Sequence, residues 1–347
     1  AMQLVGVFAL LLSLCAVDAT GRRAFYILFA NQIESDTWPH QVCQNGGQGP
    51  QGHECVDMDS YKDGAVILSP QNITRAHLDK VRAATNNATL LAYWAFGLLP
   101  LQHTEGCQCC TGHVMGDLPG RNCSTTYPCG SGAFTETLWK VFPESLAATQ
   151  LFDNGTKQVM CSYPGQAGFV FNDNSSAILA NFIGTWVREN GFDGVYLDGY
   201  VSPDKAKYSW PSDEKMDWDG DGQPDTPEQV TQQHFAWAPT FVSRLRDIIG
   251  TSSIIIANSA GALSDPNLDG LTIEMESCLD SKSCDTAIMG QRAASRGGGS
   301  PLSIMWLTHS ETMPPAEQCK RVAEMQVKFP FLLGGTDFFD GSHVVCE

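Results

Sequence analysis

Short apolar runs recur along the chain, and each is typical of a β-strand that is buried on both faces. The eight runs cover residues 24–30, 64–69, 90–96, 194–198, 253–258, 270–275, 303–308 and 329–335. Helical patterns lie between several of them. One begins at Thr74, one runs from a serine cap at Ser175 to Gly191, one opens with Pro227, and one covers residues 313–329. Strands that alternate with helices predict a parallel α/β sheet.

Eight strands favour a closed (β/α)8 TIM barrel over an open doubly wound sheet, and no G-x-G-x-x-G loop follows any of them. We expect one such domain over residues 20–347, with a cysteine-rich insertion after the third strand and a calcium loop after the fourth. Two segments fit a regular barrel poorly. Residues 31–63 show no convincing helix, and about twelve residues follow the eighth strand.

The first residues have the pattern of a secretory signal peptide. An apolar run over 4–17 is too short for a confident membrane span, and small residues precede a cleavage point after Ala19, which makes 1–19 the predicted signal. Twelve cysteines follow Cys15, an even number that allows up to six disulfides. Five N-glycosylation triplets begin at Asn72, Asn87, Asn122, Asn154 and Asn174. Together these features predict a secreted glycoprotein.

The net charge bears on the macromolecular partners of the protein, and the cysteine spacing bears on zinc binding or disulfide bonds. The net charge of −17 argues against nucleic acid or an anionic membrane surface as the main partner. Five cysteines crowd into residues 107–129, with His103 and His113 close by. In a cytosolic protein this cluster would suit zinc, whereas in an oxidising compartment a disulfide-stapled loop is favoured.

Polar and aromatic residues gather where the predicted strands end, which is the edge on which α/β barrels carry their active sites. In strand order they are Asn31, Tyr93, Trp94, Asp198, Tyr200, Asn258, Glu274, Glu276, Trp306, His309 and Asp337. Four of them have a structural alternative. Asp198 suits a turn cap, Trp306 suits the core, and the two glutamates suit an ion pair with an inward Lys or Arg.

Alternation along the strands directs two carboxylates toward the barrel axis. Glu274 and Glu276 share a face with Thr272, and Asp198 shares a face with Tyr196. An unpaired buried carboxylate is costly, and two opposed carboxyl groups are what glycoside hydrolysis requires. Flat aromatic faces beside them suit sugar rings. The pattern therefore predicts a carbohydrate substrate, with the choice between Glu274 and Glu276 as the acid left open.

Three stretches, "GFDGVYLDGY", "IIIANSAG" and "DGLTIEMES", resemble the TIM-barrel glycoside hydrolases near glycoside hydrolase family 114 and a related group of hypothetical glycosyl hydrolases. The resemblance covers roughly residues 169–340, and the first three strands more loosely. It implies a catalytic pair at Asp198 and Glu274, the latter in a D-G-x-x-x-E setting, and an active-site amide at Asn258. The cysteine-rich insertion has no counterpart in that pattern, which leaves the substrate class open.

The stretch "DWDGDGQPDTPE", residues 217–228, fits the twelve-residue calcium-loop pattern. The predicted ligands are Asp217, Asp219, Asp221, the backbone carbonyl of Gln223, Asp225 and Glu228. Pro224 and the lack of a preceding helix distinguish it from an EF-hand and favour a single dockerin-like or thrombospondin-like loop. We expect a structural Ca²⁺ that orders a wall of the substrate cleft; the alternative is a solvated acidic loop.

The predicted function is a secreted glycosidase, and the alternative is a carbohydrate-binding or extracellular structural protein on a barrel that has lost catalysis. A metal-dependent hydrolase is disfavoured because no strand end carries a His-x-His pair. A Ser-His-Asp hydrolase is disfavoured because the chain has no G-x-S-x-G.

Overall fold

The computed structural model describes most of the barrel and its helices. The described residues are 22–42, 57–95, 98–100, 109–110, 126–127, 133–147, 149–151, 157–159, 161–163, 166–199, 216–258, 265–274, 303–307, 314–329 and 332–336. The predicted signal peptide and most of the cysteine-rich stretch lie outside them.

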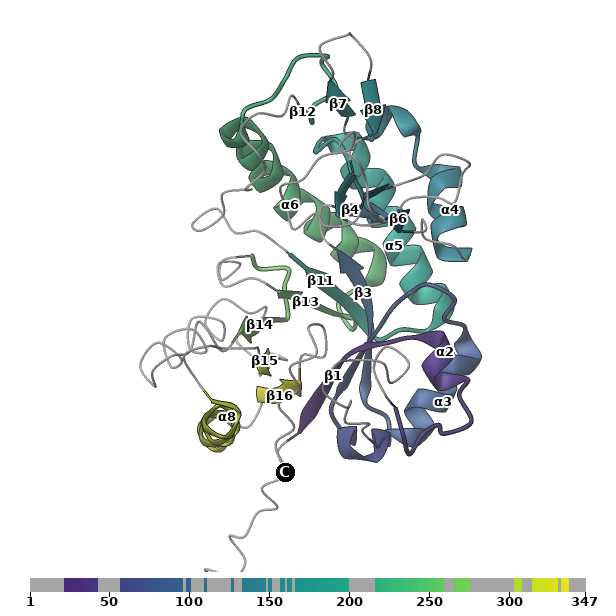
Figure 1. Ribbon diagram of the computed structural model, residues 1–347, viewed down its shortest axis with the longest axis vertical. Coiled ribbons are helices and arrows are strands. Elements are labelled where there is room, and N and C mark those ends of the chain that lie inside the picture. Colours follow the sequence, from purple (N-terminus) through teal and green to yellow (C-terminus); the bar gives the residue numbers. More distant parts are fainter. Residues whose placement is uncertain are drawn as a thin grey trace, which may run out of the picture.

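Eight parallel strands close into a barrel (Figure 1), which confirms the predicted strands and their parallel order. Around the barrel they are β1 (Arg23–Leu28), β2 (Ala65–Leu68), β3 (Thr89–Ala95), β11 (Gly194–Asp198), β13 (Ile254–Asn258), β14 (Gly270–Glu274), β15 (Ser303–Leu307) and β16 (Leu332–Thr336). The last strand begins three residues later than its apolar run. The reason is that Phe329 ends the preceding helix, where its N–H donates to the Met325 carbonyl at 2.7 Å.

The strand registers give the stagger of the barrel. If the register of each strand pair is extended in a straight line, the level of Ala24 followed through successive strands reaches β16 five positions before its first residue, Leu332, which corresponds to number 327. The residue of β16 that pairs with Ala24 is Gly335, eight residues further along. This is the shear of a (β/α)8 barrel, one residue for each strand. A residue at the same height two strands away is therefore not the one reached by following the hydrogen-bonded partners. It lies two positions from that residue along its own strand.

This stagger sorts the inward side chains into layers. One layer consists of Ala24, Leu91, Ile256 and Ile304, which all belong to the same buried cluster. The layer above it, from the other four strands, contains Ile67, Tyr196 and Thr272, and all three are at most 1% exposed. Among the described residues, the amino end and middle of the barrel are thus a closed core, which leaves the carboxyl ends of the strands as the side from which a ligand can approach.

Helices cover the outside of the barrel. They are α2 (Ala30–Ile33), α3 (Arg75–Ala84), α4 (Ala133–Val141), α5 (Asp173–Asn190), α6 (Pro227–Ile249) and α8 (Pro315–Lys328), with short 3-10 turns η2 (Met58–Tyr61) and η3 (Glu144–Leu146). Thr74 caps α3 as predicted, and Pro227 opens α6. The prediction of a serine cap for α5 is wrong. Asn172 is the cap, and its side chain accepts the Ser175 N–H at 2.9 Å.

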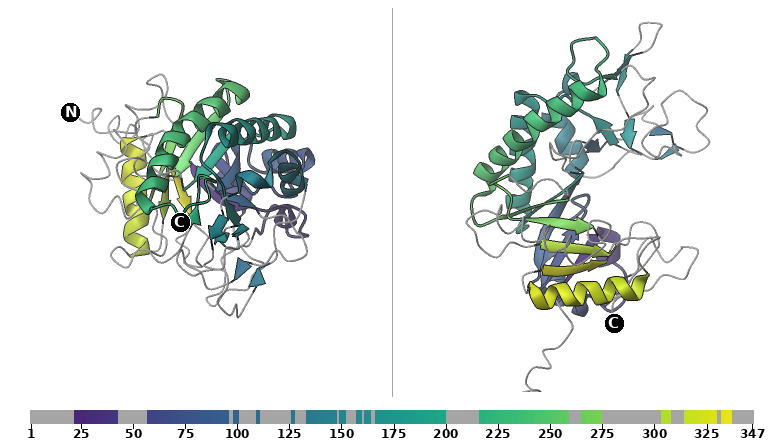
Figure 2. Two further views of the ribbon diagram at one scale, coloured as in Figure 1. Left: turned by 90° about the horizontal axis from the view of Figure 1, so that it is seen from above. Right: turned by 90° about the vertical axis from the view of Figure 1, so that its left-hand side faces the viewer.

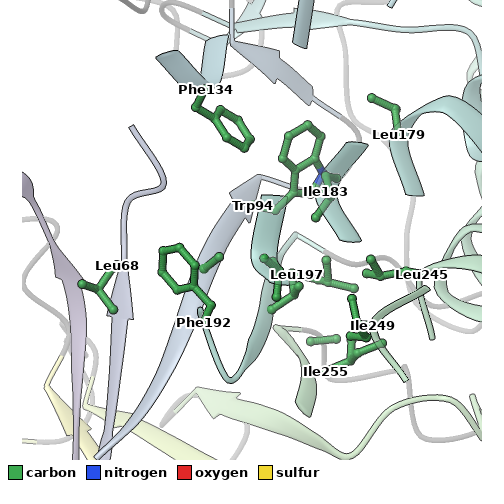
Figure 3. Packing of buried hydrophobic residues seen from close by; sticks show 14 of the residues in the cluster. Leu68, Trp94, Phe134, Leu179, Ile183, Phe192, Leu197, Leu245, Ile249 and Ile255 are labelled. Carbon is green, nitrogen blue, oxygen red and sulfur yellow. The ribbon is translucent and has the colours of Figure 1, made fainter. Parts of the chain in front are cut away.

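The larger apolar core fills the space between the strands and these helices (Figure 3). Leu197 and Ile255 contribute from the strands, and Leu245 and Ile249 of α6 pack against them. Helices α5 and α6 approach each other closely because Gly184 has no side chain. A Cβ there would lie 2.6 Å from Cγ2 of Ile248.

Two aspartates join neighbouring strands at the amino end of the barrel. Asp193, just before β11, accepts the Leu90 N–H at 2.8 Å and pairs with Arg82 at 2.9 Å. Asp269, just before β14, accepts the Ile255 N–H at 2.8 Å and pairs with Arg246. Each aspartate precedes a glycine at the start of a strand. At Gly194 a Cβ would meet the Ile254 carbonyl oxygen at 1.9 Å, so only glycine fits.

The segment between β3 and β11 builds a second layer above the barrel, together with the outer parts of α5 and α6 (Figure 2). The layer contains small antiparallel sheets formed by β4 (Leu98–Pro100), β10 (Gln166–Gly168) and β9 (Cys161–Tyr163); by β12 (Met216–Asp217), which follows β11 in the chain, β7 (Thr149–Leu151) and β8 (Lys157–Val159); and by β5 (Cys109–Cys110) and β6 (Thr126–Tyr127). The insertion after the third strand is therefore larger than its cysteine-rich part. None of the helices in the described part of the chain combines the length and the apolar composition of a membrane span.

Candidate active site

Asp198 lies at the carboxyl end of β11 and accepts hydrogen bonds at both carboxylate oxygens. The Tyr93 hydroxyl donates to Oδ2 at 2.7 Å, and Nδ2 of Asn258 donates to Oδ1 at 2.9 Å. The Thr272 hydroxyl then donates to Oδ1 of Asn258 at 2.7 Å. These four residues come from the neighbouring strands β3, β11, β13 and β14. We call them the carboxylate network.

The network is open toward the mouth of the barrel and closed below. Asp198, Tyr93 and Asn258 are half-buried, whereas Thr272 is 1% exposed. The Tyr93 ring stacks on the fully buried ring of Tyr196, with centroids 6.2 Å apart and planes 21° apart. Donors fixed on rigid strands hold the carboxylate in one orientation. Such a group suits an anionic role toward a ligand that enters from above.

Glu274 is the last residue of β14, and the register relates it to Asp198. Asp198 lies at the hydrogen-bonded level of Asn258 and Thr272 on the next two strands. Position 274, two residues beyond Thr272 on β14, lies at the same height in the barrel as Asp198. By the same correction of the register, the other two positions at this height are the buried Ser69, next to β2, and position 337, which lies outside the described residues. Positions 198 and 274 thus occupy one layer at the mouth.

Position 306 on β15 falls in the layer of Tyr93 and Asn258 by the same count. It pairs with Glu274 in the register of β14 and β15. The predicted sites Tyr200, Glu276, His309 and Asp337 lie outside the described residues.

Trp94 and Asn31 are not part of this mouth. Trp94 faces the helices, where it is 3% exposed and lies 6.0 Å from the Phe134 ring (Figure 3). It points away from the barrel axis because successive side chains on β3 alternate, and Tyr93 takes the inward face. Asn31 is exposed on the short helix α2. The prediction that Trp94 offers its face to a sugar is therefore wrong, and Asn31 lies outside the carboxylate network.

The sequence indicates Thr272 only as an inward-facing neighbour of Glu274. Its hydroxyl contact with Asn258 depends on the register between β13 and β14, which the sequence does not show. The alternation of β14 is the signal that could have found it. It puts a short polar residue on the inner face directly below a carboxylate.

The predicted calcium loop brings three carboxylates together. Ligand atoms of Asp217, Asp219 and Asp225 all lie within 4.8 Å of one another. Asp217 also accepts the N–H groups of Gly220 and Gly222, at 2.8 and 3.0 Å. Both glycines have φ near +80°, as a tightly wound loop requires. The other predicted ligands, Asp221, Gln223 and Glu228, are exposed.

The electrostatics of this loop fit a cation. Burial, together with the charges of Asp219 and Asp217, raises the pKa of Asp225 above its usual value. Asp217 is 1% exposed, so its carboxylate is also removed from water. Oxygen ligands in this arrangement are those that Ca²⁺ takes in proteins. The Asp217, Asp219 and Asp225 set therefore fits Ca²⁺.

The calcium loop is fastened to the outer end of α6. Trp218 is buried and stacks on Phe171, with centroids 5.1 Å apart, and Phe171 contacts His234 of α6 edge-on at 4.9 Å. Burial lowers the pKa of His234 to about 3, so this ring is neutral in the core. Figure 1 shows β12 and the start of α6 well beyond the tip of β11. The loop thus supports the layer above the barrel rather than lying beside Asp198.

Three of the predicted glycosylation sites, Asn72, Asn87 and Asn174, are exposed, as a glycan attachment site requires. Asn122 and Asn154 lie outside the described residues. Cys319 of α8 takes part in a disulfide bond.

No family model matches the chain. No curated protein matches its sequence. Among solved structures, it is similar to Ega3 of Aspergillus fumigatus in complex with galactosamine, with 11% identity over 87% of this chain and 86% of that one and a TM-score of 0.41. It is also similar to the glycoside hydrolase domain of PelA from Pseudomonas aeruginosa, with 11% identity, coverages of 93% and 98% and a TM-score of 0.45. A third is the maltogenic α-amylase AmyB of Thermotoga neapolitana, with 11% identity, coverages of 92% and 68% and a TM-score of 0.43. Membership of glycoside hydrolase family 114 stays a prediction.

Proposed function

We propose that this protein is a secreted glycoside hydrolase that cleaves a poly- or oligosaccharide with a pair of carboxyl groups, Asp198 and Glu274. The observation that carries the proposal is the carboxylate network. Asp198 is held by Tyr93 and Asn258 at the mouth of a closed barrel, and position 274 lies in the same layer two strands away. Adjacent strands lie about 4.8 Å apart. Two strand spacings followed by inward side chains fit the carboxyl separations of about 5–9.5 Å that glycosidases use.

The two carboxyl groups take different roles. Asp198 accepts two hydrogen bonds and so serves as the anion, which attacks the anomeric carbon or activates a water molecule. Glu274 serves as the acid that protonates the leaving oxygen, with Glu276 as the alternative acid. We propose Trp306 as a residue that stacks on a sugar ring, because position 306 lies in the layer of Tyr93.

The calcium loop supports this function indirectly. Asp217, Asp219 and Asp225 would hold Ca²⁺, with Asp221, Gln223 and Glu228 completing the ligand set of the sequence pattern. The ion would offset part of the negative charge of the clustered carboxylates and so stabilise the outer end of α6. We further propose secretion through the signal at residues 1–19 and N-glycosylation at the exposed triplets.

Reducing-end release across a panel of polysaccharides tests the proposal. We expect wild-type protein in calcium buffer to release reducing ends from at least one substrate, and Asp198→Asn to reduce that rate about a thousandfold. Glu274→Gln and Glu276→Gln, assayed in parallel, identify the acid. Asp247→Asn, an exposed carboxylate on α6, is the matched control and should keep full activity.

Two outcomes would overturn the proposal. Full activity in Asp198→Asn would remove the catalytic role of this carboxylate. Glycan binding without any turnover in wild-type protein would instead identify a non-catalytic carbohydrate-binding protein.

A further inference from the structure

Thr272 is the member of the carboxylate network that lies out of reach of a substrate. It is 1% exposed, and its hydroxyl donates to Oδ1 of Asn258 at 2.7 Å. Through its Nδ2, Asn258 donates to Asp198 at 2.9 Å. We propose that Thr272 is a positioning residue that fixes the orientation of the Asn258 amide and, through it, the Asp198 carboxylate. The catalytic part of this inference rests on the proposed glycosidase function.

The amide of Asn258 has two orientations of nearly the same shape, and only one suits the site. If the amide turned over, its oxygen would face the Asp198 carboxylate, so that two acceptors met without a proton between them. The Thr272 hydroxyl favours the productive orientation because it donates its single proton to the amide oxygen. The other acceptor near this hydroxyl, the Ala257 carbonyl, is 3.5 Å away, too far for a good hydrogen bond.

Removal of the hydroxyl should loosen the amide without changing the shape of the core. In Thr272→Val a methyl group replaces the hydroxyl, and the amide oxygen of Asn258 loses the hydrogen bond that Thr272 donates to it. The amide can then rotate away from Asp198. Thr272→Ser keeps the hydroxyl and removes only the methyl group, so it is the matched control.

A spectroscopic experiment tests the positioning without any substrate. Protein labelled with 15N-asparagine is compared as wild type, Thr272→Val and Thr272→Ser, and the Asn258 side-chain signals are assigned by their loss in Asn258→Ala. We expect a deshielded, slowly exchanging amide proton in wild type and in Thr272→Ser, and its loss in Thr272→Val. A wild-type Asn258 signal in Thr272→Val would overturn the positioning role.

Kinetics tests the link to catalysis. We expect Thr272→Val to lower kcat about tenfold with KM within about twofold of wild type, because the residue touches no substrate. In an Asn258→Ala background the same change should have no further effect, since the two residues act as one unit. An equal loss in both backgrounds, or an equal loss in Thr272→Ser, would indicate a packing role and contradict the inference.

The two experiments separate failure of the inference from failure of the proposed function. If the amide signal behaves as expected while no variant turns over any glycan, Thr272 positions Asn258 but the glycosidase proposal falls. Cooperative thermal unfolding of all variants shows that each one folds.

Discussion

The two aspartate–arginine pairs at the amino end of the barrel permit a quantitative prediction within one molecule. Both aspartates accept a backbone N–H from the neighbouring strand and pair with an arginine, but their exposures differ. The side chains of Arg246 and Asp269 are 6% and 19% exposed, whereas those of Arg82 and Asp193 are 23% and 41% exposed. The same substitution, aspartate to asparagine, should therefore cost more stability at position 269 than at position 193.

The loss of stability in each variant depends on the interactions that its arginine keeps. In Asp269→Asn the Arg246 guanidinium stays buried but has only neutral acceptors, the new side-chain amide oxygen and the carbonyls of Gly250, Ser253 and Asn267. Breaking a buried pair costs about 3–5 kcal/mol, and these carbonyls favour the lower end, about 3 kcal/mol. In Asp193→Asn water replaces part of the lost interaction. The cost there should be about 1 kcal/mol.

Scanning calorimetry at a fixed heating rate measures the difference. For a chain of this length the entropy of unfolding is about 0.7 kcal/mol/K, so Asp269→Asn should lower Tm by about 4–5 °C and Asp193→Asn by about 1–2 °C. Both sites lie at the amino ends of strands, far from the mouth, so kcat at 25 °C should not change. Equal shifts in Tm, or a larger shift in Asp193→Asn, would refute the reasoning from burial.

Two further predictions concern the mouth and the calcium loop. Tyr93→Phe removes the hydroxyl donor to Asp198 but keeps the ring stack on Tyr196, so kcat should fall about tenfold or more while Tm changes by less than about 2 °C; unchanged kcat would exclude this hydrogen bond from catalysis. Calcium removal should lower Tm more at pH 7 than at pH 4. The pKa of Asp225 is raised in the folded protein. At a pH between the usual value and this raised value, the folded protein therefore keeps a proton on Asp225 that the unfolded chain has lost. Without calcium, the free energy of unfolding then falls as the pH rises through this window. Bound Ca²⁺ offsets this loss, and a calcium-induced Tm increase that did not grow between pH 4 and pH 7 would contradict the assignment.

The strands could be predicted from the sequence because each one is a short apolar run between turn residues. Inward and outward faces were also predictable, since alternation correctly separates Tyr196 from Leu197 and Thr272 from Leu271. Trp94 shows the limit of residue type as evidence. An aromatic next to a strand end suggests sugar binding, but the inward face of that strand belongs to Tyr93, and the fold places Trp94 against Phe134.

The layer above the barrel could not be predicted in the same way. Its sheets are antiparallel and short, two or three residues a strand, and a pattern of two or three residues carries no period. The partner of β12 is β7, more than sixty residues earlier in the chain. Spacing alone does indicate the calcium loop, because its ligands are local in sequence. Its place at the outer end of α6 follows from the packing of Trp218 on Phe171, which is not local.

Helix α6 connects the two proposed sites. Leu245 and Ile249, near its carboxyl end, pack on Leu197 and Ile255, which flank the carboxylate network from outside. The calcium loop precedes the first turn of the same helix, which at 23 residues is about 34 Å long. Loss of the ion would therefore act first on the outer end of α6 and on the layer above the barrel. The geometry of Asp198 depends on hydrogen bonds between strands, so we expect stability to respond to calcium before the catalytic rate does.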